Sequence, residues 1–466
     1  MNSNNDLKNL KSKLLYTRKN TALQLSEDLL KKAILYCDNY KNFLNCAKTE
    51  RKACSTALNL AKKNGFEQFD WKKTYKPGEK FYFLNRNKCL ILAVIGKKNL
   101  EEGLNLTVSH VDSPRLDLKP NPLFEDSELA FFKTHYYGGL KKYQWTTIPL
   151  SLYGVLIKQN GEKIEIEIGD NENDPVFCIS DLLPHLADNQ MKLPLKDAIN
   201  GENLNIIVGS SPLKCNEKTE LVKLNIMKIL NEKYGIVERD FLSAELEAVP
   251  SFKACDVGFD RSLIGAYGQD DKVCAYNALQ AIINCENLDK TAITVLADKE
   301  EIGSYGNTGM NSNFLEHFIF HLCEKYNVSA QITLMNSCCL SADVGAAFDP
   351  AYADVFEKRN CAICGCGTIV TKYTGSRGKS STSDAHAEFL NKLTRMLDEN
   401  KIIWQSGEIG KVDLGGGGTV AMFLAKLNMD VVDIGVPLLS MHSPFEISSK
   451  VDIFENYRAI KAFLNL

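Results

Sequence analysis

Apolar and polar residues follow two different patterns along this chain, and the first predicts a buried sheet. Runs of β-branched and apolar residues at 88–95, 104–108, 292–297 and 431–435 are typical of central strands. Longer stretches with few helix breakers predict helices at 22–65, 217–233, 270–285, 312–326, 384–399, 418–427 and 452–465. Strands that alternate with helices indicate an α/β fold, in which a mixed sheet is covered by helices.

The block from about residue 120 to 248 has the second pattern. Short segments at 146–157 and 164–168 alternate apolar and polar positions between polar turns, which is typical of antiparallel strands. A chain of 466 residues is also too long for one compact core. We therefore expect two domains, one made of residues 1–119 and 249–466, and an inserted β-rich domain of residues 120–248.

The apolar run at 292–296 is followed by two adjacent carboxylates, Glu300 and Glu301. Carboxylates at the end of a buried strand are unfavourable unless a positive group holds them, and strand ends are where chemistry sits in open α/β sheets. One carboxylate could bind a metal ion while its neighbour reaches a water molecule. A solvated charge cluster in a loop is the alternative interpretation if these two residues are considered alone.

Four other segments carry metal-type ligands next to apolar runs. These are His110 and Asp112 after the run 104–109, Asp270 before the helix at 273–279, Asp343 after the run 331–335, and His442 after the run 431–437. Two histidines and three carboxylates suit a pair of zinc-like ions, because one carboxylate can bridge the ions while each ion takes one histidine and one further carboxylate. Together the five segments predict a two-metal site.

The segments SHVDSP, GQDDKVCAY, ADKEEIGS, SADV and MHSP occur in this order. They closely resemble the M18 family of metallo-aminopeptidases, the group of aspartyl aminopeptidase and aminopeptidase I. The resemblance extends from residue 57 to the last helix, and YTGSRGKS and GGGGT are similar to its bacterial branch. It implies a zinc-exopeptidase-like catalytic domain (residues 1–119 and 249–466) and an inserted β-rich dimerisation domain (residues 120–248).

The resemblance also implies a role for each candidate residue. One ion would be held by His110 and Asp343, the other by Glu301 and His442, and Asp270 would bridge them. Glu300 would be the general base on a metal-bridging water, and Asp112 would orient the metal-bound histidine. The ions are implied to be two zinc ions per subunit, with cobalt or manganese as alternatives.

Substrate recognition is the part where the sequence departs from the family. Ala346 and Asp349 stand at positions where many relatives carry a histidine. For a peptide with a free N-terminus, we expect Lys372 to face an acidic first side chain, so that acidic residues are weakly favoured. Backbone N–H groups in the stretch 413–419 precede a predicted helix and could bind peptide carbonyls, and the candidates there are Gly417, Gly418 and Thr419.

The resemblance further implies a homo-oligomer, a dodecamer built from dimers. The 120–248 block would form the dimer contact. His185 matches the position from which one subunit reaches into a neighbour's active site, where it would stabilise the tetrahedral oxyanion. On its own, His185 would be interpreted as a surface histidine.

The amino-acid composition argues against two classes of binding partner, nucleic acids and membranes. Lys and Arg total 55 against 58 Asp and Glu, so the net charge of −3 gives no electrostatic reason to bind nucleic acid or an anionic membrane. The N-terminus lacks a signal-peptide pattern, and no apolar stretch approaches the roughly 18 residues of a membrane span. The 15 cysteines are scattered, and several lie in apolar runs, which indicates free thiols in a reducing cytoplasm.

Other patterns lead to competing hypotheses. Cys361, Cys364 and Cys366 resemble part of a metal site in a strand-like context but lack a nearby fourth ligand. His317 and His321 share one helix face without the glutamate of a zinc helix, so packing or surface placement is favoured. The stretch 375–380 suggests a phosphate loop, but the Walker spacing requires glycine where Tyr373 stands. A related dinuclear exopeptidase or deacylase, and a non-catalytic shell protein, are the remaining alternatives.

Overall fold

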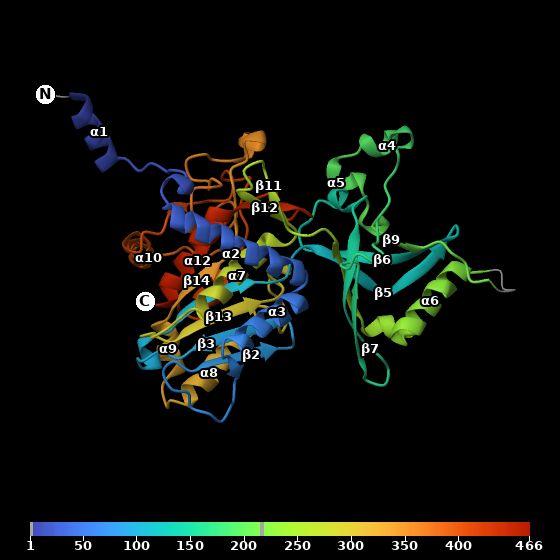
Figure 1. Cartoon of the computed structure of the whole chain (residues 1–466), viewed down its shortest axis with the longest axis horizontal. Coiled ribbons are helices and arrows are strands. Elements are labelled where there is room, and N and C mark those ends of the chain that lie inside the picture. Colours follow the sequence, from blue (N-terminus) through green and yellow to red (C-terminus); the bar gives the residue numbers. More distant parts are fainter. Residues whose placement is uncertain (1–2, 215–218) are drawn as a thin grey trace.

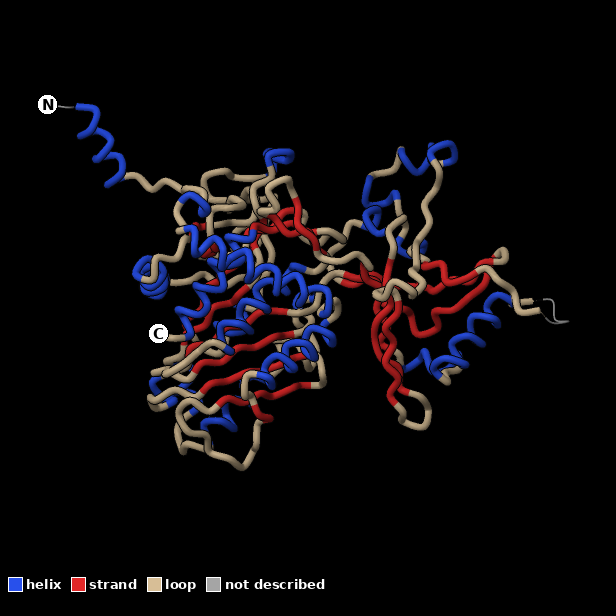
Figure 2. The backbone as a smooth tube through the Cα atoms, in the orientation of Figure 1, coloured by secondary structure: helices blue, strands red, loops and turns tan. Residues whose placement is uncertain are grey.

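The computed structural model describes residues 3–214 and 219–466 of the chain. Figure 1 shows two bodies side by side: a larger one around a nine-stranded sheet and a smaller one around a six-stranded sheet. Figure 2 shows that helices flank the strands of the larger body, whereas strands and loops dominate the smaller one.

The nine-stranded sheet forms the centre of the larger body. In spatial order its strands are β1 (Glu67–Gln68), β2 (Lys80–Asn85), β3 (Cys89–Val94), β13 (Ala292–Ala297), β4 (Asn105–His110), β14 (Cys338–Ala342), β18 (Asp430–Gly435), β16 (Thr368–Thr371) and β17 (Trp404–Ser406). The four neighbours β13, β4, β14 and β18 run parallel to one another. Their carboxyl ends therefore meet at one edge of the sheet.

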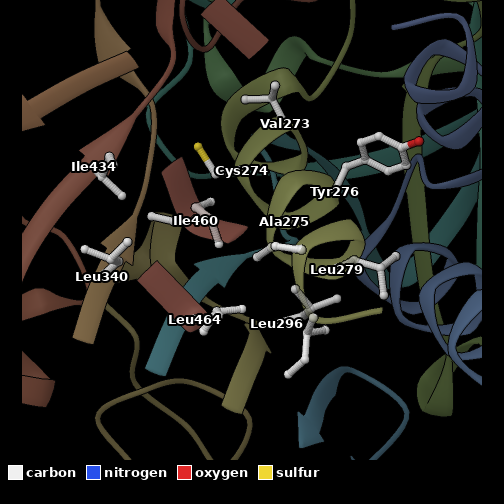
Figure 3. Packing of buried hydrophobic residues seen from close by; sticks show 14 of the residues in the cluster. Val273, Cys274, Ala275, Tyr276, Leu279, Leu296, Leu340, Ile434, Ile460 and Leu464 are labelled. Carbon is white, nitrogen blue, oxygen red and sulfur yellow. The ribbon is translucent and has the colours of Figure 1, made fainter. Parts of the chain in front are cut away.

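Helices cover both faces of this sheet, because its strands are apolar on both sides. One face packs against α2 (Glu27–Cys46), α3 (Glu50–Lys63), α7 (Gln269–Ile283), α10 (Ala387–Glu399) and α12 (Lys450–Leu464). The other packs against α8 (Phe314–Glu324), α9 (Ala330–Met335) and α11 (Ala421–Ala425). Figure 3 shows the first of these cores, with Leu279 of α7 and Ile460 of α12 beside Leu296 and Leu340 of the sheet. A separate helix, α1 (Ser3–Leu14), extends away from the body (Figure 1).

The six-stranded sheet is antiparallel throughout and has a core of its own. In spatial order its strands are β8 (Lys163–Ile168), β7 (Leu150–Ile157), β10 (Glu245–Pro250), β5 (Arg115–Asp126), β6 (Leu129–Tyr137) and β9 (Ile206–Gly209). It carries α6 (Leu221–Tyr234) and two short helices, α4 (Asp188–Met191) and α5 (Leu195–Ala198). The chain enters it directly after β4 and leaves it directly before β11.

A third, five-stranded sheet lies beside the carboxyl edge of the large sheet. Its strands are β11 (Cys255–Val257), β12 (Leu263–Ala266), β20 (Glu446–Ser449), β19 (Pro437–Leu439) and β15 (Gly345–Ala346). Strand β12 leads into α7, and the loop between β19 and β20 carries His442. This small sheet thus holds two segments of the candidate site next to each other.

The predicted α/β class with a mixed, helix-covered sheet is confirmed. One predicted strand is wrong. The run 331–335, expected as the strand before Asp343, forms helix α9. The strand that precedes Asp343 is β14, formed by the next apolar run. The helical stretch 22–65 is divided by a break at Ala47–Thr49. Of the helix predicted at 217–233, residues 217 and 218 lie outside the described residues, and α6 begins at Leu221.

Candidate metal centre

Parallel strands bring three of the predicted ligand segments to one edge. His110 is the last residue of β4, and Asp343 directly follows β14. Glu300 and Glu301 lie in a short 3₁₀ helix (η7, Glu300–Ile302) just after β13, and Lys299 before it adopts a left-handed φ of 69°. These strands are neighbours in the order β13–β4–β14, so the side chains meet without any long loop.

The small sheet supplies the other two segments. Asp270 lies at the start of α7, immediately after the turn that ends β12. His442 lies in the loop after β19 with a φ of 64°. Buried Glu446 ties the two segments together, because its Oε1 accepts the His442 backbone N–H at 2.8 Å and its Oε2 accepts that of Asp270 at 3.1 Å.

The five predicted ligands form two groups that share Asp270. Asp270 Oδ1 lies 3.2 Å from His110 Nε2, and Asp343 Oδ1 lies 3.7 Å from the same nitrogen. The other oxygen, Asp270 Oδ2, lies 3.1 Å from His442 Nε2, which is 3.4 Å from Glu301 Oε2. In each group, one atom from every residue lies within 4.8 Å of the others, as ligands around an ion require.

The electrostatics of the cluster fit cations. Burial raises the pKa of Glu301 well above its usual value, and the neighbouring Asp270 raises it further. Burial likewise raises the pKa of Asp343. Glu301 Oε1 is buried and has no hydrogen-bond partner among the described residues. A concentration of buried carboxylates with an unpartnered oxygen is unfavourable unless positive charge is bound there.

The two histidines compensate part of this charge. Burial lowers the pKa of His442, but its hydrogen bond to Asp270 and the charge of Glu301 outweigh burial and raise the pKa to about 10. Burial also opposes the charged form of His110, yet hydrogen bonds to Asp112, Asp270 and Asp343 raise its pKa well above the usual value. A protonated imidazole cannot bind a metal, so ions would compete with protons here.

Asp112 is fully buried beside the ligands. Its carboxylate lies 3.4 Å from His110 Nδ1 and accepts the backbone N–H groups of Glu300 and Glu301, both at 3.2 Å. The backbone carbonyl of Asp112 lies closer, at 3.1 Å, and accepts the hydrogen bond of His110 Nδ1, so that His110 Nε2 is turned toward Asp270. Such a contact fixes the ring orientation and the tautomer that a metal-binding histidine needs.

Glu300 lies at the mouth of the cluster without being a member of either ligand group. Its Oε2 is 4.0 Å from His110 Nε2, and 17% of its side chain is exposed. Burial raises the pKa of Glu300 to about 8, although the charge of His110 opposes the shift. A carboxyl group whose pKa lies near the working pH can take up and return a proton.

Three contributors to the site carried no signal in the sequence patterns. Glu446 holds two ligand segments by backbone contacts, which side-chain motifs do not reveal. Tyr137 donates its hydroxyl to Asp112 Oδ2 at 2.7 Å, and the Gly139 carbonyl lies 2.7 Å from His442 Nδ1. Tyr137 is the last residue of β6 and Gly139 follows two residues later, far in sequence from every proposed ligand except His110.

The remaining candidate residues lie outside the cluster. His185 is exposed in a 3₁₀ turn (Pro184–Leu186) of the smaller body. Lys372 is exposed and forms an ion pair with Asp384 at 2.5 Å. Gly417 and Gly418 are exposed in the loop before α11, whereas Thr419 donates a hydrogen bond to Asp433.

A cavity opens beside Asp343 between β14, β16 and the glycine-rich loop. Its walls are small, apolar and threonine side chains together with three acids, Asp343, Glu408 and Asp433. Thr419 also lines it, and burial raises the pKa of Asp433 to about 7. Lys372 is not among the lining residues.

The other patterns of metal-type or phosphate-binding residues noted in the sequence do not form a further ligand group among the described residues. Neither group of metal-type ligands in the described ranges contains Cys361, Cys364 or Cys366, which lie in a turn rather than in a strand. His317 and His321 are exposed on α8, as expected for surface residues. The stretch 375–380 is a loop whose Lys379 pairs with Asp384.

A mixed α/β sheet with two groups of histidine and carboxylate side chains beside its carboxyl edge is an arrangement typical of metal-dependent hydrolases. The sequence model of the aminopeptidase I zinc metalloprotease family (M18) matches residues 43–464. The chain therefore belongs to the M18 family, as its motifs predicted, and is a metallo-aminopeptidase.

Individual relatives agree with this assignment. A probable M18 family aminopeptidase 1 from Clostridium acetobutylicum is 49% identical over 460 residues, covering 97% of this chain and 99% of the relative. The crystal structure of aminopeptidase I from the same organism superposes with a TM-score of 0.92 at 47% identity, covering 97% and 100% of the two chains. An S. cerevisiae mApe1 dodecamer shares the fold at 21% identity (TM-score 0.75; 93% and 97% covered).

Among the helices of residues 3–214 and 219–466, none is both long enough and apolar enough to cross a membrane.

Proposed function

We propose that this aminopeptidase is a co-catalytic enzyme with two divalent metal ions, zinc in the first place and cobalt or manganese as alternatives. The observation that carries the proposal is Asp270, whose two oxygens face two different histidines at 3.2 and 3.1 Å. His110 and Asp343 would complete one coordination sphere, and Glu301 and His442 the other. When bound, the ions would polarise the scissile carbonyl and lower the pKa of water.

Glu300 is the proposed general base. It would accept a proton from the attacking water and deliver it to the amine that leaves when the peptide bond breaks. Its position suits both steps, because Glu300 lies beside both ligand groups without belonging to either, and 17% of its side chain is exposed to the site. Asp112 would keep Glu300 in place through its backbone N–H and would hold His110 in the binding tautomer.

The cavity beside Asp343 has a volume of only about 20 Å³, room for about one water molecule, so it is too small for the first side chain of a peptide. Its lining carries Glu408 and Asp433 and, among the described lining residues, no basic group. The expected weak preference for acidic residues depended on Lys372, which is paired with Asp384. Lys372 would have to leave Asp384 to meet an acidic side chain, and a weak preference for acidic first residues stays a prediction. Thr419 and the neighbouring Gly417 and Gly418 are the proposed contacts to the peptide.

We also propose a homo-oligomer in which residues 120–248 form an inserted dimerisation domain. Large apolar side chains are exposed along this region, among them Leu182 at 53%, Leu186 at 70%, Met191 at 67% and Leu195 at 59%. A concentration of exposed apolar residues typically marks a protein interface. His185 lies within this stretch, so an interface here would offer it to a neighbour's active site. A relative described as a dodecamer supports assembly of the dimers into a dodecamer.

A reducing compartment such as the cytoplasm suits the cysteines. All 14 cysteines in the described ranges are free, and most of them are buried. Free thiols persist where glutathione and thioredoxin keep them reduced.

The decisive experiment is a panel of aminoacyl p-nitroanilides assayed after loading with zinc, cobalt or manganese, with N-acetylated versions as controls. We expect release from free N-termini, somewhat faster for aspartate or glutamate than for leucine or lysine, and none from acetylated substrates. Comparable hydrolysis of acetylated substrates would indicate a deacylase or endopeptidase instead. Absence of hydrolysis with every metal would favour a non-catalytic shell protein.

A further inference from the structure

The last residues of β6 reach from the six-stranded sheet into the metal centre. Tyr137 ends this strand, and Gly138 and Gly139 follow it. Gly138 has a φ of 73°, and a Cβ there would lie 3.3 Å from Glu301 Cβ and 3.4 Å from Pro114. The segment is therefore packed directly against a ligand, in a backbone conformation that favours glycine.

Tyr137 acts on the centre through one hydroxyl. It donates to Asp112 Oδ2 at 2.7 Å, and the same carboxylate oxygen accepts the Glu301 backbone N–H. The other Asp112 oxygen faces His110 Nδ1 at 3.4 Å. The Tyr137 hydroxyl thus holds the Asp112 carboxylate in place. That carboxylate contacts one residue of each ligand group, His110 in the first and Glu301 in the second.

Gly139 makes the corresponding contact to the second histidine. Its carbonyl lies 2.7 Å from His442 Nδ1, so this nitrogen carries the proton and Nε2 is left for a ligand role. The segment after β6 therefore orients His442 directly. It acts on His110 only through Asp112, whose backbone carbonyl accepts His110 Nδ1–H and whose carboxylate Tyr137 holds.

The Tyr137 ring is itself held firmly. The Arg115 guanidinium lies 3.9 Å from the ring centroid. Buried Arg115 is fixed in turn by Glu50 of α3 at 3.4 Å and by Glu247 of β10 at 3.3 Å. Glu50 belongs to the larger body and Glu247 to the six-stranded sheet, so the ring lies at a charged junction between the two bodies.

We propose that Tyr137 is a positioning residue through which the six-stranded sheet sets the metal affinity of the centre. This inference rests on the proposed ligand roles of His110, Glu301 and His442. The sheet would be needed for a competent metal site as well as for contacts between subunits. Loss of the phenol should weaken metal binding without removing a ligand.

The test compares Tyr137→Phe with Tyr153→Phe in the full-length protein. Tyr153 is 1% exposed in the same sheet, and its hydroxyl has no hydrogen-bond partner among the described residues, so its removal controls for loss of a buried hydroxyl. Zinc affinity is measured by competition with a chromophoric chelator, and the spectrum of the cobalt-loaded protein reports ligand geometry. Melting of the metal-free forms reports stability.

Tyr137→Phe should bind zinc up to about 10-fold more weakly than the wild type, the lower end of the effect of groups that contact metal ligands directly, because Tyr137 acts through Asp112. Its cobalt spectrum should change, and activity at limiting zinc should fall and recover with excess zinc. Tyr153→Phe should match the wild type in all three. Equal zinc affinity and identical cobalt spectra in the two variants would overturn the proposal. The proposed function would fail separately, if wild-type protein bound no zinc or showed no activity with it.

Discussion

The two ligand groups that share Asp270 differ in how the chain holds them. His110 and Asp343 sit at the ends of neighbouring strands, and only 2% and 12% of their side chains are exposed. Glu301 and His442 come from a 3₁₀ turn and a loop, and the His442 side chain is 34% exposed in a left-handed backbone conformation. Strand ends are rigid and loops move more easily. We therefore expect a firmly held ion in the first group and a more exchangeable ion in the second.

Removal of the shared ligand should have the largest effect. Asp270→Ala takes a donor from both groups at once, so the variant should lose both ions and all measurable peptidase activity. Metal analysis after desalting and an aminopeptidase assay check this. Asp271→Asn is the matched control: Asp271 belongs to neither ligand group, and an amide oxygen can still accept the His110 backbone N–H that Asp271 Oδ2 accepts at 3.3 Å, so both ions should remain. If Asp270→Ala still bound two ions per chain, Asp270 would not be a ligand shared by the two groups, and the comparison between the groups would fail.

Glu300→Gln should separate chemistry from metal binding. Because Glu300 belongs to neither ligand group, the variant should retain both ions and its KM while kcat falls by roughly 10²–10⁴-fold. Glu301→Gln, its neighbour, should instead release the ion of the second group. If Glu301→Gln kept its metal and Glu300→Gln lost it, the two roles would have to be exchanged.

The two histidines provide a direct comparison of the groups. His442→Gln should leave about one ion per chain, the one held by His110 and Asp343. His110→Gln should disturb both ions, because it disrupts the buried group on which Asp270 and Asp112 converge. In the wild type, titration with a chelator should release metal in two steps. Release in a single step, with equal losses in both variants, would show that the groups do not differ.

The smallest expected effect concerns the pH dependence of the metal-free protein. The pKa of His442 is about 10, above its unfolded value, so its stabilising contribution is complete below about pH 6.5 and is lost as pH rises through 10. Glu300, with a raised pKa of about 8, also favours the folded state less as pH rises from about 4.5 to 8. The melting temperature of chelated protein should fall by roughly 2 °C or more from pH 6 to pH 9.5. Metal binding should tighten over the same range, because protons compete less.

The clustering of the proposed ligands was predictable because each follows or precedes an apolar run, and the parallel neighbours β13, β4 and β14 place such positions at one edge. The contributions of Tyr137 and Gly139 were not predictable, since they depend on how the six-stranded sheet packs against that edge. Glu446 acts on backbone N–H groups, which leave no spacing rule in a sequence. The run 331–335 was mistaken for a strand because a short apolar run fits a buried helix equally well.

Glu446 has a consequence for the kinetics of metal uptake. It joins the backbones of Asp270 and His442, so the spacing of the second group is set when the chain folds, before any ion arrives. Such a preorganised pair of loops has little conformational entropy left to lose on binding. The rate of metal binding should therefore be limited by dehydration and diffusion of the ion. In a Glu446→Ala variant, the loops would first have to become ordered around each ion, so metal binding should be slower.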